Sequence, residues 1–347
     1  MLPVTLRIGC LLVLLAACSP TLVGQAGNWT AVASTGVTPE QRHESAFVRV
    51  GDRFYLLGGR GNRRIQVFDP ETNTWSNTNT FLNNIHHFQA RAYDGKIYLL
   101  GALNDNFPNE DPLTNVVIYD PQTDKLSNGP TIPTNRRRGS SGVVLYKDVF
   151  YIVSGNRNGH SAYLDDGTTP ANVPWVDKYD PRTGKWTVLP DAPHARDHFM
   201  AEVIGDRLYV AGGRRSKVGT PAGAWADTEA AVDVFELTTE TWLAADSTPA
   251  DIPTQRAGAA TAVLDGKLFV IGGEVEHFPP HDLALPHAEV LDPANGRWQR
   301  VADLVLPRHA TQAVVHGGRI YLPAGSKTKG GTEIDPKEVF LEAFSQE

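Results

Sequence analysis

The chain has 347 residues, of which 32 are Lys or Arg, 39 are Asp or Glu, and 41% are hydrophobic. This composition is typical of a globular protein and excludes a disordered one. The formal net charge of −7 gives no electrostatic reason to expect nucleic acid as a partner. The length alone predicts two or three domains, unless the sequence contains repeats.

The chain begins with an apolar segment that leads to a cysteine. Residues 8–17 are apolar and uncharged, Arg7 precedes them, and Cys18 follows. The segment is too short to span a bilayer stably, which takes roughly 20 apolar residues. Its length suits a secretory signal, so we expect residues 1–17 to be a signal peptide.

The segment Leu15-Ala16-Ala17-Cys18 resembles the lipobox of bacterial lipoproteins. In that family the signal is removed before the cysteine, which is acylated. The resemblance implies that Cys10 is discarded, and that Cys18 carries lipid and attaches the protein to a membrane. Residues 18–27 would then form a lipidated tether. The protein would be exported and lipid-anchored, at the bacterial outer membrane, in the periplasm or at the cell surface.

One pattern recurs six times after residue 28. A strand and a polar turn precede a second strand, whose aromatic residue stands three positions before a pair of small residues. A third strand ends in a turn, which begins Asp-Pro in four of five repeats. Six residues after the end of this strand, four repeats have a Trp and one has a Leu. These are hairpin signatures. The aromatic residues are Tyr55, Tyr98, Tyr151, Tyr209, Phe269 and Tyr321, and the later residues are Trp75, Leu126, Trp186, Trp242 and Trp298.

These elements resemble the kelch repeat. The resemblance covers nearly all of residues 28–347 and implies an all-β fold, a six-bladed kelch β-propeller that forms a single domain. The sixth repeat reaches its third strand at residues 338–341, and no Trp follows. Residues 28–32 contain Trp29 and match residues 185–189. We therefore expect the N-terminal strand to be the fourth strand of the sixth blade and to close the ring.

The two faces of such a ring differ in their connections. The turns between strands one and two and between strands three and four are short and share one face. The loops between strands two and three share the other face with the connections between blades, and they vary in length. Variable loops on a rigid scaffold are the usual place for function. These loops contain the candidates His160, Arg214, Trp225 and Glu274, and Trp225 suits stacking on a sugar ring.

Basic residues recur at the start of each innermost strand. The position 13 residues before the repeated aromatic residue is Arg in five repeats, and His follows one or two positions later in four. We expect this register to surround the mouth of the central channel. The Arg side chains would bind an anionic or polyhydroxylated ligand, or bond loop carbonyls and seal adjacent blades, as kelch propellers often do. The residues are Arg42, Arg138, Arg196, Arg256 and Arg308, and His43, His86, His87, His198 and His309.

The sequence predicts neither a metal site nor a cofactor. His86 and His87 are adjacent on a predicted strand and would point to opposite faces, so both cannot line the channel. Ligands that converge from several blades remain an open alternative.

Two functions remain open. The first is a binding module for a glycan, peptide or protein partner. Its candidate ligand-binding residues are Arg42, His43, His87, Arg138, His160, Arg196, His198, Arg214, Trp225, Arg256, Arg308 and His309.

The second function is a carbohydrate-active enzyme, such as a sugar mutarotase or epimerase. The architecture resembles that of bacterial N-acetylneuraminate epimerase, which uses acid/base residues and no metal. The first candidates for such a pair are His198 and Glu274. Galactose oxidase chemistry is excluded, because it needs a tyrosine joined to a cysteine and no cysteine follows Cys18.

Overall fold

The computed structural model describes residues 26–108, 110–221, 223–276 and 283–346. The predicted signal peptide, Cys18 and most of the predicted tether lie outside the described residues. The described residues contain 27 strands and two 3-10 helices, Thr134–Arg136 and Ala245–Ser247. No helix in this part of the chain is long and apolar enough to cross a membrane.

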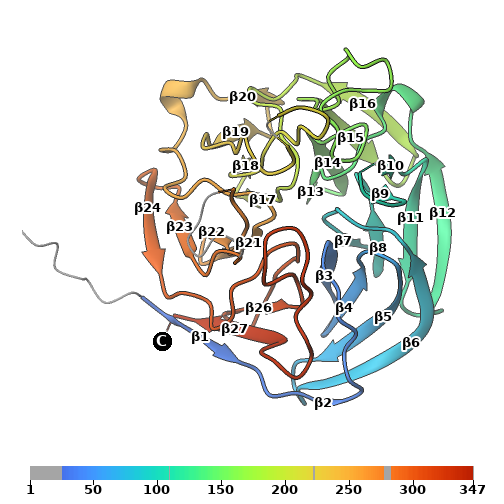
Figure 1. The fold of residues 1–347 in the computed structure, drawn as a ribbon, viewed down its shortest axis with the longest axis vertical. Coiled ribbons are helices and arrows are strands. Elements are labelled where there is room, and N and C mark those ends of the chain that lie inside the picture. The colour runs from blue at the N-terminus through green and yellow to red at the C-terminus, as the bar shows by residue number, and fades with distance from the viewer. Residues whose placement is uncertain (1–25, 109, 222, 277–282, 347) are drawn as a thin grey trace, which may run out of the picture.

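Six of the seven sheets form blades arranged radially around a centre (Figure 1), and the seventh is a two-stranded ribbon in a loop. The first blade contains β3 (Ser45–Val50), β4 (Arg53–Gly58), β5 (Asn62–Asp69) and β6 (Thr74–Asn83), with β2 (Thr35–Gly36) parallel to β6 at its edge. The second contains β7 (Arg91–Tyr93), β8 (Lys96–Leu99), β11 (Asn115–Asp120) and β12 (Lys125–Thr131), and a ribbon of β9 (Leu103–Asn104) and β10 (Asp111–Pro112) lies in its loop. The third contains β13 (Gly142–Tyr146), β14 (Val149–Val153), β15 (Val176–Asp180) and β16 (Lys185–Leu189).

The other three blades repeat this order. The fourth contains β17 (Ala201–Ile204), β18 (Arg207–Val210), β19 (Asp233–Glu236) and β20 (Thr241–Trp242). The fifth contains β21 (Ala260–Leu264), β22 (Lys267–Ile271), β23 (Ala288–Asp292) and β24 (Arg297–Val301). The sixth contains β25 (Val314–His316), β26 (Arg319–Pro323), β27 (Leu341–Ser345) and β1 (Asn28–Ala31). The predicted all-β, six-bladed propeller is confirmed.

The second strand of each blade is apolar on both sides because the neighbouring blades cover both of its faces. In β22, for example, Leu268, Phe269, Val270 and Ile271 are all buried. Such continuous apolar runs are typical of strands that have no solvated face. The core is therefore the set of apolar layers between successive blades.

A large apolar residue of the third strand, aromatic in five blades and Leu291 in the fifth, faces the repeated Trp or, in the second blade, Leu126 across the outer hairpin. The same register recurs in all six blades, so the sequence repeat is a structural repeat. The pairs are Phe68 with Trp75, Tyr119 with Leu126, Tyr179 with Trp186, Phe235 with Trp242, Leu291 with Trp298, and Phe344 with Trp29.

The sixth blade is composed of both ends of the domain. β1 pairs antiparallel with β27, and Trp29 packs on Phe344 with ring centroids 5.4 Å apart. β27 begins at Leu341, three residues later than the third strand was predicted. Residues 335–338 form a turn instead, in which the Asp335 amide donates to the Glu338 carboxylate at 3.1 Å. An acidic side chain that accepts a local backbone bond favours a turn over a strand.

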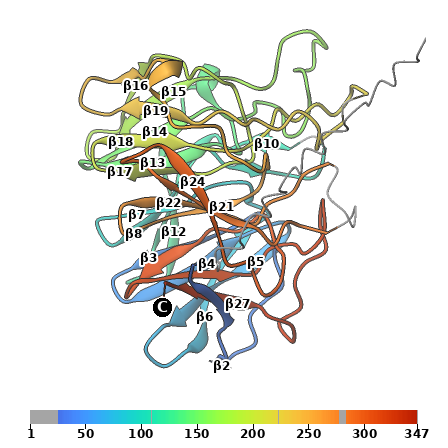
Figure 2. The ribbon, with the colours of Figure 1, turned by 90° about the vertical axis from the view of Figure 1, so that its left-hand side faces the viewer.

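The two faces of the ring differ as expected. Seen edge-on, the long connections project from the right-hand side of the ring, and the short turns lie on the left (Figure 2). We call the side with the loops between strands two and three the loop face.

Candidate functional site

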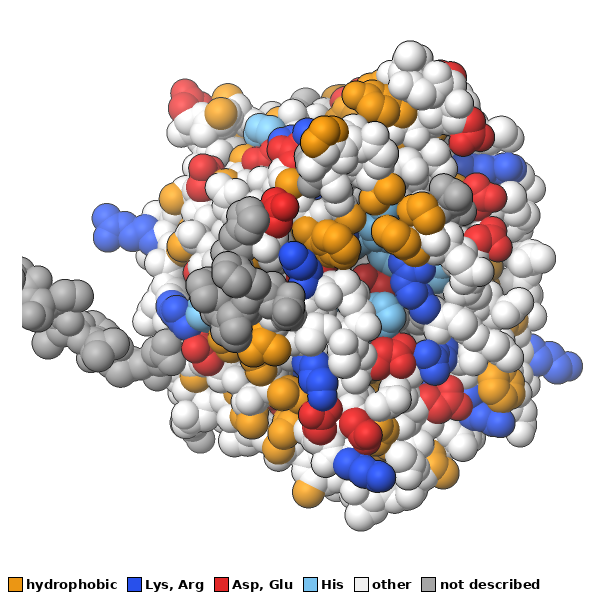
Figure 3. All heavy atoms as spheres, in the orientation of Figure 1, with side chains coloured by type: hydrophobic (Ala, Val, Ile, Leu, Met, Phe, Trp, Pro, Cys, Tyr) orange, Lys and Arg blue, Asp and Glu red, His pale blue; other side chains and the backbone are white. Residues whose placement is uncertain are grey.

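The loop face has a hollow over the centre of the ring. Its cavity volume is about 460 Å³, within the range of about 300–1,000 Å³ typical of small-molecule sites. The connection between strands two and three of every blade contributes to it, and two residues before β3 complete the wall. The lining residues are His43, Glu44, Arg60, Asn106, Phe107, His160, Arg214, Trp225, Glu274, Gly330 and Gly331. His, Arg and apolar side chains gather at this centre in Figure 3.

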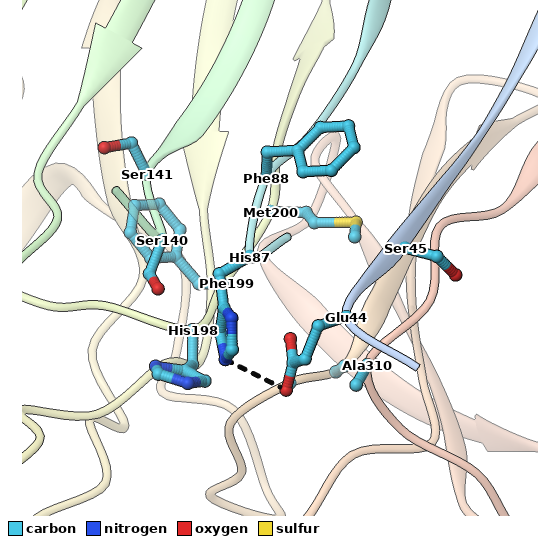
Figure 4. Close-up of a pocket in the computed structure, with 12 residues that line it drawn as sticks. Glu44, Ser45, His87, Phe88, Ser140, Ser141, His198, Phe199, Met200 and Ala310 are labelled. Carbon is cyan, nitrogen blue, oxygen red and sulfur yellow. Dashed lines mark ion pairs between the residues drawn. The ribbon is translucent and has the colours of Figure 1, made fainter. Parts of the chain in front are cut away.

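A second, smaller cavity lies in the central channel next to this hollow. Its volume is about 30 Å³, enough for a water molecule or two but not for a ligand. Figure 4 shows Glu44, His87 and His198 on one side of this cavity, with Phe88, Phe199 and Met200 among its other walls. Glu44 lines both cavities, so it stands at the boundary between the hollow and the channel.

Three histidines form a cluster at this boundary. His87 lies before β7, His160 lies in the β14–β15 loop, and His198 lies before β17. All three are 4–5% exposed. The ring centroids are 4.7 to 5.0 Å apart, and the Nε2 atoms of His160 and His198 are 3.0 Å apart. We call these three residues the histidine cluster.

The backbone at the start of each innermost strand explains how these side chains converge. One residue per blade there is left-handed, and amide-to-carbonyl bonds connect neighbouring blades. The His87 amide donates to the Glu44 carbonyl (3.1 Å), and the Ser140 amide to the His87 carbonyl (2.9 Å). The φ angles are 53° to 63° at Glu44 (56°), His87 (53°), Ser140 (54°), His198 (53°), Gly258 (63°) and Ala310 (61°). This conformation is costly for most non-glycine residues, so the ring of bonds must hold it.

The prediction that His86 and His87 point to opposite faces is wrong. His87 is left-handed and precedes β7, so the alternation of a strand does not apply to the pair. Their Nδ1 atoms are 2.6 Å apart, and His86 Nε2 is 2.9 Å from the Asp105 carbonyl. Burial lowers the pKa of His86 to about 4 and the pKa of His87 well below its ordinary value.

Each ring of the histidine cluster is next to a carboxylate. His160 Nδ1 lies 3.0 Å from Glu110, His198 Nδ1 contacts Asp197, and His87 Nε2 lies 3.2 Å from Glu44. Burial alone would raise the pKa of each carboxyl group. Neighbouring groups outweigh this effect. The pKa of Glu44 is well below its ordinary value beside His87. The pKa of Asp197 is lowered by His198, Arg214 and the Ser216 amide, and that of Glu110 falls to about 2 beside His160 and Arg60. These three carboxylates are therefore ionised at neutral pH.

Glu274 and Arg214 form a second buried pair in the hollow. Arg214 Nη1 donates to Glu274 at 2.5 Å, and the Gly330 amide donates to the other carboxylate oxygen at 2.9 Å. Burial alone would raise the pKa of Glu274. His309, Arg214 and the Gly330 amide have the opposite and larger effect, so the pKa falls to about 2. Glu274 thus faces the hollow as a carboxylate and holds the loop that contains Gly330.

The predicted ligand-binding role of the five repeated arginines is not what the structure shows. Arg42, Arg138, Arg196, Arg256 and Arg308 are 0–3% exposed, and none of them lines the hollow. Each donates to backbone carbonyls of its own blade and to a side chain on the third strand. Arg256, for example, bonds the Gly272 and His287 carbonyls at 3.0 and 2.9 Å and Glu289 at 2.6 Å. The alternative structural role left open by the sequence therefore accounts for them.

The other predicted residues divide between hollow and interior. His43, His160, Arg214, Trp225 and Glu274 line the hollow, and His87 and His198 line the adjoining channel cavity. His309 is 1% exposed, and its Nε2 lies 2.8 Å from the Thr328 carbonyl, so it supports a loop.

The carboxylates beside the histidine cluster, and Arg60 and Phe107 in the wall of the hollow, were not among the predicted site residues. Glu44 and Asp197 each stand next to a histidine of the repeated register, which was the available signal. Glu110 belongs to the variable loop of the second blade, and nothing in the sequence connects it to His160. Arg60 bonds Glu110 at 2.7 Å, and Phe107 is 50% exposed at the rim.

Comparisons with known proteins agree with this fold. The profile of the family described as Attractin/LZTR1 beta-propeller matches residues 24–275, and that of the kelch motif matches residues 255–305. Kelch-like protein terF of Aspergillus terreus is 31% identical over 326 residues, covering 88% of this chain and 66% of the relative. Kelch domain-containing protein 3 of Rattus norvegicus is 26% identical over 264 residues, covering 72% and 62%. The chain therefore spans slightly less than two thirds of both relatives.

The solved structure described as "Structure of YjhT" has a TM-score of 0.69 to this protein. The match covers 86% of this chain and 94% of that one, at 16% sequence identity. At this identity the likeness shows a common fold.

Proposed function

The chain belongs to the kelch-repeat β-propellers of the Attractin/LZTR1 family, and from this premise we propose that its loop-face hollow binds a glycan. Kelch propellers are generally interaction modules, and fold alone does not identify the ligand. The ligand class must therefore be argued from the side chains of the hollow.

The hollow itself is the observation that carries the proposal. It is concave and limited to about 460 Å³, which suits one or two sugar rings better than a protein surface. Phe107 and Trp225 provide aromatic faces, and the apolar face of a sugar stacks on such rings. His43, Arg60 and Asn106 add hydrogen-bonding groups for hydroxyl or carboxylate substituents.

We further propose that this site operates outside the cytoplasm. The lipobox-like segment ending at Cys18 supports export and lipid anchoring, at the bacterial outer membrane, in the periplasm or at the cell surface. Mass spectrometry of the membrane-extracted protein tests this part. A mature N-terminus at Cys18 with attached acyl chains is expected, and an unmodified chain that retains residues 1–17 would refute it.

A glycan screen tests the binding proposal. Neutral and acidic oligosaccharides would be screened by thermal shift, and hits would be titrated by calorimetry. We expect saturable binding that weakens in His160→Ala and persists in Lys147→Ala, because Lys147 lies in the β13–β14 turn on the opposite face. Binding lost in Lys147→Ala, or a peptide or protein as the only ligand, would refute the glycan proposal.

A second candidate is acid/base catalysis on the bound sugar. Two imidazoles, His160 and His198, each face a carboxylate through Nδ1, as in catalytic pairs where the carboxylate orients the ring. A free reducing sugar that binds would be followed by NMR for anomer exchange. Acceleration that His198→Ala or Glu274→Gln abolishes would support the enzyme, and saturable binding without turnover would leave a binding protein.

A further inference from the structure

The protons on the histidine cluster can be placed from the atoms that surround each ring. A carboxylate oxygen only accepts, so His160 donates from Nδ1 to Glu110 at 3.0 Å, and His198 donates from Nδ1 to Asp197. In a neutral imidazole this leaves a lone pair on Nε2. The two Nε2 atoms are 3.0 Å apart, so two lone pairs face each other.

His87 also has its lone pair on Nε2, because its Nδ1 faces the neighbouring residue His86. The Asp105 carbonyl only accepts, so His86 donates to it from Nε2 and accepts at Nδ1. His87 Nδ1, 2.6 Å away, must then be the donor, which leaves the lone pair of His87 on Nε2. That buried nitrogen has no hydrogen bond and lies 3.2 Å from a Glu44 oxygen. Three lone pairs and a carboxylate oxygen thus meet in one place, an arrangement that a bound cation would stabilise.

The local charge balance indicates the same deficit. Among the groups that line the hollow or contact the three rings, there are four carboxyl groups and two guanidinium groups, so the acidic side chains outnumber the basic ones by two. The groups are Glu44, Glu110, Asp197 and Glu274, and Arg60 and Arg214. A divalent cation would balance this charge.

We propose that His87, His160 and His198, with Glu44, form a binding site for a divalent transition metal ion of the zinc type. Ligand atoms of the three histidines lie within 4.8 Å of one another. Two nitrogens bound to tetrahedral Zn²⁺ at about 2.05 Å lie about 3.3 Å apart, close to the 3.0 Å between His160 and His198. Three imidazoles and one carboxylate are the ligand chemistry that such ions prefer.

The surroundings resemble the outer shell of a metal site. Two of the three rings are oriented by a carboxylate on the nitrogen opposite to the proposed ion, which fixes the tautomer and makes the imidazole more basic. The four ligands come from the first four blades, one from each, so the folded ring assembles the site. His160 and Glu44 also line the hollow, so a bound ion would be reachable from it.

The test of this metal site does not depend on the glycan proposal, because the metal ion is the only ligand used. The full-length purified protein would be stripped with a chelator, loaded with Zn²⁺ and analysed by elemental mass spectrometry and calorimetry. We expect one equivalent per chain with a dissociation constant below about 1 μM. Co²⁺ would give the visible absorption of tetrahedral cobalt, and Zn²⁺ would displace it.

Variants separate the buried histidine cluster from a more exposed histidine. His160→Ala and His198→Ala should each weaken Zn²⁺ binding at least about 100-fold, and Glu110→Gln should weaken it about 10-fold. The matched control His194→Ala removes a partly exposed imidazole that pairs with Asp233 outside the cluster, and it should bind as the wild type does. Circular dichroism would confirm that each variant folds.

Three results would overturn the proposal. The first is that neither Zn²⁺ nor Co²⁺ binds in stoichiometric amount. The second is that His160→Ala and His198→Ala leave binding unchanged, and the third is that His194→Ala alone abolishes it. A glycan that binds the chelator-treated protein while zinc does not would overturn the metal site and leave the binding function intact.

Discussion

The repeated arginines and the histidine cluster differ in how their polar atoms are paired. His87 and His198 stand two positions after the register of the repeated arginines, and His160 lies in the β14–β15 loop. Both sets are almost completely buried. Arg256 satisfies its donors with two loop carbonyls and Glu289, whereas His87 Nε2 has no hydrogen bond. The comparison shows that burial alone does not separate structural from functional polar residues. An unpaired buried atom does not separate them by itself either, because Arg196 Nε also lacks a partner. What distinguishes the histidine cluster is that three imidazole nitrogens lie within 4.8 Å of one another.

The largest expected effect is the loss of a repeated arginine. Arg256→Ala would leave Glu289 buried without its charged partner and two carbonyls without a donor. We expect the free energy of unfolding to fall by about 3–5 kcal/mol, measured by urea denaturation. The control Arg53→Ala removes a partly exposed ion pair with Asp69 and should cost less than about 1 kcal/mol. Similar losses in both variants would contradict the structural role.

The pair of Glu274 and Arg214 predicts a pH-dependent difference. The pKa of Glu274 falls from 4.5 to about 2 in the folded protein, so its stabilisation is fully present above about pH 4.5 and disappears as the pH falls toward 2. Glu274→Gln should therefore be less stable than the wild type by about 3 kcal/mol at pH 7. The difference should shrink as the pH falls below 4.5. A difference independent of pH, measured by thermal unfolding, would rule out the charge as its cause.

A change in the histidine cluster should affect binding more than stability. In His160→Ala, Glu110 keeps its bond from Arg60 at 2.7 Å, so we expect unfolding to change by only about 1 kcal/mol. Glycan affinity should fall at least about tenfold, or about 1.4 kcal/mol. Calorimetric titration and urea denaturation of one preparation measure both quantities. A stability loss as large as that of Arg256→Ala would remove the distinction between the two sets.

The smallest expected effect is at the aromatic wall. Trp225 is partly buried, and Lys329 Nζ lies 5.3 Å from its ring centroid. Trp225→Ala should weaken glycan binding about fivefold through lost stacking, whereas Trp225→Phe should retain most of the affinity. Intact binding in Trp225→Ala would place the sugar elsewhere in the hollow.

The fold was predictable because its signals are local and repeat six times. An aromatic residue, a small-residue pair and an Asp-Pro turn recur in register, and the repeat shows in all six outer hairpins. The third strand of the last blade was placed three residues too early because Glu338 bonds the Asp335 amide. Local hydrogen bonds of Asp335 and Glu338 close the turn before this boundary, and the apolar pattern does not encode them.

The candidate site was only partly predictable because its contacts join distant segments. The repeat predicted that His160, Arg214, Trp225 and Glu274 lie on the loop face, where they line the hollow. The pairing of Glu110 with His160 joins residues 50 positions apart in different blades, and no local pattern reports it. The left-handed conformation of His87 is likewise imposed by bonds to neighbouring blades, so the strand rule failed there.

Side-by-side titration of two variants separates ligand binding at the hollow from the structural role of the arginines. The screened glycan would be titrated by calorimetry into His160→Ala, which changes a residue that lines the hollow, and into Arg256→Lys, at a temperature where both are folded. We expect the affinity to fall at least about tenfold in His160→Ala and to remain that of the wild type in Arg256→Lys. Intact binding in His160→Ala, or an equal loss in both variants, would show that the hollow is not the glycan site.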